Sequence, residues 1–173
     1  REPVETLLDV GTGSGCIAIT ISLEKLANNI IAIDISDTAL IIAKKNAKDH
    51  CTDNITFSMT NFLQDKITKK FDVIVSNPPY ISQSKISGLQ PEINQFEPIH
   101  SLTDNKDGLT FFKHFSNTAN NILNESGVLL IEFGGESQLS AIKEIFSSNK
   151  FDISIHNDIN KSPRVLEVSI INT

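Results

Sequence analysis

A glycine-rich turn near the start of the chain has the residue types and spacing of a cofactor-binding loop. It consists of Gly11, Thr12, Gly13, Ser14 and Gly15, between an apolar run and an apolar helix pattern. Glycines allow a tight turn and close approach of a ligand to the backbone, and the following helix offers free N–H groups. The Gly-x-Gly-x-Gly spacing differs from that of dinucleotide-binding and phosphate-binding loops. The turn therefore favours a cofactor without a pyrophosphate.

An acid stands at the end of the next apolar run. Asp34 closes this predicted strand, and a carboxylate there is suited to accept hydrogen bonds from both hydroxyls of an adenosine ribose. The alternative is that the glycine turn only connects a strand to a helix and that Asp34 merely ends an element. The combination of turn and acid favours a nucleoside-containing cofactor.

A second motif follows the apolar run 71–76 and consists of Asn77, Pro78, Pro79 and Tyr80. The prolines remove two N–H donors and fix φ, so the Asn77 side-chain oxygen and the Pro78 carbonyl become preset acceptors. A planar NH2 group has two donors, and these two acceptors would orient its nitrogen for attack on a methyl group. Tyr80, the only tyrosine, would offer a flat surface to the substrate. A stiff loop without chemistry is the alternative.

The elements that must position these motifs alternate between strands and helices. Predicted strands cover residues 6–10, 30–34, 55–60, 71–76, 128–133, 152–156 and 165–171, and predicted helices cover 14–27, 37–49, 108–123 and 136–149. This alternation is typical of an α/β protein with a mostly parallel sheet. The last two strands are too close in sequence for a helical crossover, so they are expected to pair antiparallel. Residues 81–107 have no clean period and are interpreted as a partly helical, functional insertion.

Composition limits the class of protein. The 173 residues fit one domain, residues 1–173, and contain no apolar run long enough to span a membrane. The net charge of −6 disfavours a nucleic-acid partner. No cysteine or histidine pair has metal-ligand spacing, and no export signal is visible. We expect a soluble, cytoplasmic, monomeric protein without a metal site.

Together these motifs resemble the class I S-adenosylmethionine-dependent methyltransferases, and within them the glutamine methyltransferases of peptide chain release factors. This resemblance predicts a Rossmann-like sheet of seven strands with the last strand antiparallel. It covers nearly the whole chain and is carried further by the stretches 34–40, 75–81, 96–98, 107–109, 132–134 and 164–165.

The resemblance implies S-adenosyl-L-methionine as cofactor and S-adenosyl-L-homocysteine as product. It implies cofactor contacts at residues 11–15, Asp34, Asn61, Phe62 and Asn77, and substrate recognition by residues 77–80. The implied substrate is the glutamine of the Gly-Gly-Gln motif in class 1 release factors, which act in translation termination.

Three departures from the family pattern are visible. Asn61 stands where the family usually has an acid, so the adenine contact is expected to depend more on stacking against Phe62. Residues 103–106 replace a glycine that usually precedes the Asp-Gly-Leu triplet, and the family's N-terminal helical domain is absent from this sequence. Glu97, in the insertion, is a weaker candidate for the substrate cleft.

Two other functions stay open. A methyltransferase acting on an exocyclic amino group of a nucleic-acid base would use the same turn, with a flipped base stacked on Tyr80. A cofactor-binding module without catalysis is the second alternative. The acidic charge disfavours the first, and the intact 77–80 motif disfavours the second.

Overall fold

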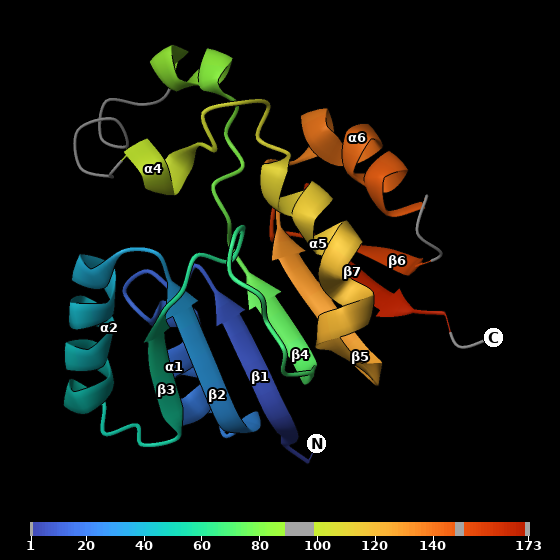
Figure 1. The fold of residues 1–173 in the computed structure, drawn as a ribbon. Helices are drawn as coiled ribbons and strands as arrows, with labels where there is room; N and C mark the ends of the chain where they lie inside the picture. The colour runs from blue at the N-terminus through green and yellow to red at the C-terminus, as the bar shows by residue number, and fades with distance from the viewer. Residues whose placement is uncertain (1, 89–98, 148–150, 172–173) are drawn as a thin grey trace.

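The computed structural model describes residues 2–88, 99–147 and 151–171 (Figure 1). Its strands are β1 (Val4–Val10), β2 (Ala27–Asp34), β3 (Ile55–Met59), β4 (Phe71–Ser76), β5 (Leu123–Glu132), β6 (Phe151–Asn157) and β7 (Pro163–Ile170). Its helices are α1 (Cys16–Leu23), α2 (Asp37–Asp49), the 3-10 helix η1 (Gln83–Gly88), α4 (Ile99–Leu102), α5 (Thr110–Ile122) and α6 (Glu136–Ser147).

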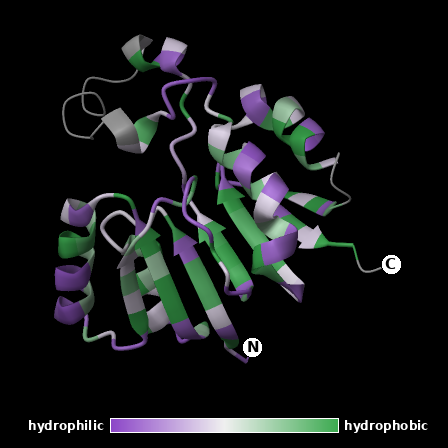
Figure 2. Ribbon diagram, in the orientation of Figure 1, coloured by the Kyte–Doolittle hydropathy of each residue, from purple (hydrophilic) through white to green (hydrophobic). Residues whose placement is uncertain are grey.

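All seven strands form one sheet in the order β3-β2-β1-β4-β5-β7-β6. β1 to β5 are parallel, whereas β7 pairs antiparallel with both β5 and β6. The predicted fold class is confirmed, including the antiparallel last strand. The central strands are coloured hydrophobic over most of their length (Figure 2), as expected for strands buried on both faces.

Separate apolar cores cover the two faces of the sheet. The larger core packs the phenylalanines of α5 and α6, such as Phe112 and Phe146, against Leu8, Ile74 and Ile131. The smaller core packs Ala18 of α1 against small and branched residues of β1 and β2. The carboxyl edges of the parallel strands are left free for a ligand, the usual location in such folds.

Several element bounds differ from the sequence predictions. The first helix was expected to continue to residue 27, but α1 ends at Leu23 because β2 already begins at Ala27. Lys25, with φ 53°, lies in the left-handed region between them and reverses the chain. β5 begins at Leu123, five residues before the predicted start.

The insertion is partly helical, as expected, and lies above the carboxyl edge of the sheet (Figure 1). Its two sides are joined by backbone hydrogen bonds from Ile81 N to Leu102 O at 2.9 Å and from Gln83 N to Lys106 O at 3.0 Å. Residues 96–98 of the family-like pattern, and with them Glu97, lie outside the described residues. Because of these two hydrogen bonds, the segment 102–106 that leads to α5 lies beside the segment 81–83 that follows the 77–80 motif.

Candidate functional site

Strand register brings the predicted site residues to one edge of the sheet. Val10, at the end of β1, pairs with Ile33 of β2 and with Ser76 of β4. Ser76 Oγ also donates to Val10 O at 2.9 Å. Gly11 and Asn77 therefore directly follow the neighbouring strands β1 and β4, and Asp34 is the last residue of β2, on the other side of β1.

The glycine turn depends on left-handed backbone at three positions. Gly11, Gly13 and Gly15 have φ values of 73°, 57° and 84°, which residues with a Cβ rarely adopt. A Cβ at Gly15 would lie 3.0 Å from Ile19 and 3.2 Å from Ala43, whereas one at Gly11 or Gly13 would meet nothing within 4 Å. Gly15 thus permits close packing of α1 on α2, and Gly11 and Gly13 leave open space for a ligand.

Asp34 joins the turn to the start of α2. Its Oδ2 accepts from Gly13 N at 2.9 Å and its Oδ1 accepts from Ser36 N at 2.8 Å. Ser36 in turn caps α2, because its Oγ accepts from Ala39 N. The carboxylate is only partly buried, so each oxygen retains a lone pair for a ribose hydroxyl.

Asn61 and Phe62 follow β3 at the same edge, since Thr60 N donates to Asp34 O at 2.9 Å. The Asn61 side-chain oxygen accepts from Leu63 N, which leaves its NH2 group as the available donor. The Phe62 ring is 5% exposed and lies in the larger core, 4.5 Å from the Phe115 ring between centroids. Adenine stacking on this ring is therefore not what the geometry favours, and a contact would use the Phe62 backbone.

An apolar residue that sequence reasoning missed lies beside Asp34. Ile35 is 62% exposed although it directly follows a buried strand. An exposed isoleucine beside Asp34 offers an apolar surface to a flat ligand. Its position immediately after Asp34 was the sequence signal that could have identified it.

The 77–80 motif continues β4 and presents one free polar side chain. Asn77 is exposed, and none of the described residues bonds its side chain. Pro78 is buried and Pro79 half-buried, which anchors the turn on its apolar side. The amide of Asn77 is therefore available to a ligand beside the glycine turn.

Tyr80, the last residue of this motif, is held by a side-chain hydrogen bond. Its hydroxyl donates to Glu132 Oε1 at 3.1 Å, at the end of β5. Burial and then the Glu132 carboxylate raise the pKa of Tyr80 to about 12, against a smaller opposing effect of Arg164. Tyr80 is thus a neutral, fixed ring in the physiological range. It borders a cavity of about 390 Å³ that Lys85, Gln138 and Arg164 also line.

Residues 11–15, Asp34, Asn61 and 77–80 lie at one edge of the sheet, whereas the Phe62 ring lies in the core. Further residues that the sequence analysis did not single out lie around Tyr80. Glu132, Gln138 and Arg164 contact or border Tyr80. None of the helices in the described ranges is long and apolar enough to cross a membrane. Within the same ranges, no group of three acidic, histidine or cysteine side chains is arranged to hold a metal ion.

Fold and site together define the class of S-adenosylmethionine-dependent methyltransferases, with a glycine turn, a strand-ending acid and an Asn-Pro-Pro-Tyr motif at one sheet edge. A family model described as methyltransferase small domain matches residues 2–92. The chain belongs to this family.

Two relatives align with almost the whole chain. The release factor glutamine methyltransferase of Fusobacterium nucleatum is 38% identical over 163 residues, which cover 92% of this chain and 46% of that protein. The bifunctional methyltransferase of Rickettsia bellii is 37% identical over 167 residues, covering 95% of this chain and 30% of that protein. The chain thus spans less than half the length of either relative.

Solved structures share the fold. The ribosomal protein L11 methylase of Lactobacillus delbrueckii has a TM-score of 0.69 at 24% identity, covering 98% of this chain and 71% of that one. Magnesium protoporphyrin IX methyltransferase from Synechocystis PCC 6803, solved with bound S-adenosylmethionine, has a TM-score of 0.63 at 16% identity, covering 99% and 72%.

Proposed function

We propose that this chain transfers a methyl group from S-adenosylmethionine to the side-chain amide nitrogen of a glutamine in a peptide chain release factor. The observation that carries the proposal is the free Asn77 amide, fixed beside the glycine turn by two prolines. The likeness to release factor glutamine methyltransferases over more than nine-tenths of the chain supports the substrate class.

The proposed cofactor site consists of residues 11–15, Asp34, Asn61 and Phe62. The open space above Gly11 and Gly13 would accommodate the amino-acid part of the cofactor. Asp34 would accept from the ribose hydroxyls, and Ile35 would cover one face of the base. When bound, the cofactor supplies an electrophilic methyl group on a positively charged sulfur.

The proposed role of the 77–80 motif is to orient the nucleophile. Asn77 Oδ1 and the Pro78 carbonyl each accept one N–H of the substrate amide, so its nitrogen faces the cofactor. As the nitrogen–carbon bond forms and the carbon–sulfur bond breaks, positive charge develops on the nitrogen. The same two acceptors stabilise this charge, and one N–H proton is then lost to solvent. Tyr80 covers the flat amide group.

The test compares Asn77→Ala with Asn120→Ala, a control at an exposed position of α5. We expect Asn77→Ala to lower methyl transfer to a release factor at least about 100-fold, while cofactor affinity stays within about three-fold. The Asn120 variant should behave like the wild type. Loss of cofactor binding in Asn77→Ala would mean that Asn77 serves the cofactor site and would contradict its proposed role in orienting the substrate.

The substrate is tested with labelled cofactor and four acceptors. These are a release factor, the same factor with its Gly-Gly-Gln glutamine replaced, and single-stranded and duplex nucleic acid. Label on the unaltered factor alone supports the proposal. Label on nucleic acid would favour the base-methylating alternative, and cofactor binding without any transfer would favour a non-catalytic module.

A further inference from the structure

Three segments meet at the carbonyl of Tyr80. Gln138, in the first turn of α6, donates from Nε2 to Tyr80 O at 2.8 Å. Its other amide atom, Oε1, accepts from the N–H of Gly134, the second residue after β5, at 2.8 Å. One half-buried side chain therefore ties the end of the 77–80 motif to the end of β5.

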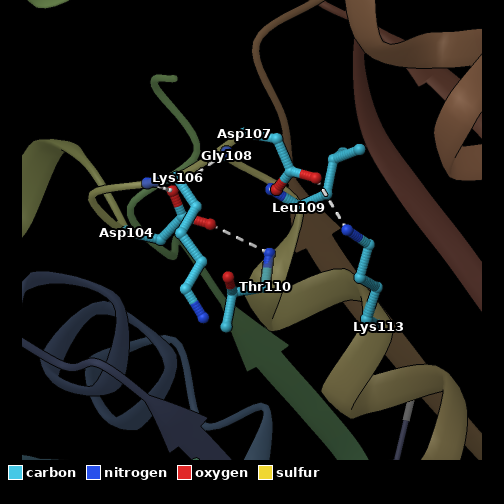
Figure 3. Close-up of polar contacts among 7 residues, drawn as sticks. All are labelled: Asp104, Lys106, Asp107, Gly108, Leu109, Thr110 and Lys113. Carbon is cyan, nitrogen blue, oxygen red and sulfur yellow. Dashed lines mark hydrogen bonds and ion pairs between the residues drawn. The ribbon is translucent and has the colours of Figure 1, made fainter. Parts of the chain in front are cut away.

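The third segment is a turn before α5, which brings Gly108 against the same carbonyl. A Cβ at Gly108 would lie 2.2 Å from Tyr80 O and 3.1 Å from Gln138 Nε2. Gly108 also has a φ of 78°, which favours glycine. The turn is closed by Asp104, whose Oδ1 accepts from Gly108 N at 2.9 Å (Figure 3). Gly108 thus covers the hydrogen bond between Gln138 and Tyr80.

Apart from the φ angles that the prolines fix, no side-chain hydrogen bond in the described part of the chain holds the Asn77 end of the motif. Pro78 and Pro79 carry no N–H to donate, and no described residue bonds the Asn77 side chain. The direction in which Asn77 points therefore depends on the backbone fixed at either end. Ser76 is fixed in β4 by its pairing with β1 and β5. The other end is fixed at Tyr80, through its hydroxyl and its carbonyl.

We infer that Gln138 is a positioning residue for methyl transfer, which holds Asn77 and Pro78 in place by bonding the Tyr80 carbonyl. The inference rests on the proposed function of the 77–80 motif. It predicts an effect on the rate of transfer and none on the cofactor site, because residues 11–15 follow β1 and Asp34 ends β2, whereas Gln138 bonds the segments after β4 and β5.

The first test uses one substitution of Gln138 and one control. Gln138→Leu removes both hydrogen bonds at similar size, and Ser140→Ala changes an exposed residue of the same helix. We expect Gln138→Leu to lower kcat at saturating substrates about 10- to 100-fold, because small misplacement of reacting groups has effects of that order. Cofactor Kd should stay within about two-fold, and Ser140→Ala should match the wild type.

Gln138→Glu adds a readout that a merely structural role would not give. An ionised carboxylate still accepts from Gly134 N but repels the Tyr80 carbonyl, whereas a protonated carboxyl donates to it again. The ratio of variant to wild-type kcat should therefore rise as the pH falls from about 8 to about 5, towards the glutamate pKa. A flat ratio would overturn the inference.

A spectroscopic test works without any substrate. The chain has one tyrosine and no tryptophan, so its intrinsic fluorescence reports on Tyr80 alone. Gln138→Leu should increase quenching of this emission by acrylamide about two-fold, as the ring loses its fixed, half-buried position. Ser140→Ala should leave the quenching unchanged.

The two tests separate the inference from the proposed function. If acrylamide quenching increases in Gln138→Leu but the wild-type protein labels no release factor, the contact between Gln138 and Tyr80 is supported and the proposed substrate is rejected. Wild-type transfer with unchanged quenching and unchanged kcat in Gln138→Leu would reject the positioning role. A fall in cofactor affinity that parallels the fall in kcat would also reject it.

Discussion

At the residue scale, the acid beneath the glycine turn has an unusual environment. Asp9 is fully buried, and its Oδ2 accepts from Thr12 Oγ1 at 2.7 Å. Its Oδ1 has no hydrogen-bond partner within the described part of the chain. Burial raises the pKa of Asp9 from 3.8 to about 6. The turn is therefore supported by a carboxyl group that changes charge close to neutral pH.

This raised pKa predicts how stability depends on pH. Because the folded-state pKa exceeds the unfolded one, the stabilising effect of the proton is complete below about 3.8 and is lost as the pH rises through about 6. Ionised Asp9 should then cost on the order of 2–3 kcal/mol of the free energy of unfolding. Asp9→Asn keeps an acceptor for Thr12 and removes the charge, so it should stabilise the protein more at pH 8 than at pH 5.

Urea unfolding of both proteins at the two pH values measures this difference directly. Other titrating groups are common to both proteins, and their effects cancel in the comparison. An equal gain at pH 5 and pH 8 would mean that Asp9 does not titrate between them.

At the element scale, the turn before α5 replaces the glycine expected there with a carboxylate that binds backbone amides. Asp104 accepts from Lys106 N and Gly108 N through Oδ1 and from Thr110 N through Oδ2. Although burial raises the pKa of Asp104, these bonds hold it below its usual value. Asp107, nearby, accepts from Leu109 N and forms an exposed ion pair with Lys113 (Figure 3).

The two neighbouring acids provide a matched comparison. Asp104→Ala leaves three amides without their acceptor at the start of a helix, so it should lower the free energy of unfolding by about 1–2 kcal/mol. Asp107→Ala loses one amide bond and an exposed ion pair, and we expect about 1 kcal/mol or less. Chemical denaturation of both variants checks the order. A larger loss in Asp107→Ala would contradict the role of Asp104 in closing the turn.

The sequence predicted the elements better than the contacts between them. Glycine spacing and strand-ending polar residues placed the two motifs, because parallel strands bring their carboxyl ends to one edge. Gln138 was missed because its importance comes from contact with Tyr80, 58 residues away. The burial of the Phe62 ring was missed for the same reason, since it depends on Phe115 of a later helix. Periodicity carries no information on such pairs.

At the scale of the whole molecule, the proposed cofactor site joins parts of the sheet that are otherwise linked only through strand pairing. It includes residues at the ends of β1, β2 and β3, and Asp34 Oδ2 already bonds the turn through Gly13 N. A ligand that contacts these segments together binds the folded chain and not the unfolded one. Cofactor binding should therefore stabilise the whole sheet.

At a concentration about 100 times the dissociation constant, this linkage is worth about 2.7 kcal/mol. For a domain of this size it should raise Tm by about 5–10 °C, measured by differential scanning fluorimetry with and without S-adenosylhomocysteine. Asp34→Ala should reduce the shift to about 2 °C or less, because the ribose loses its acceptor. Asp49→Ala, at the far end of α2, should keep the full shift.

The shift is compared within each variant, so a lower starting Tm of Asp34→Ala does not affect the result. If Asp34→Ala kept the full shift, the ligand would bind without the strand-ending acid, and the edge formed by β1 and β2 would not be its site. A shift lost in Asp34→Ala and kept in Asn77→Ala would separate the two functions of the edge, with cofactor affinity on the β1–β2 side and substrate orientation at the end of β4.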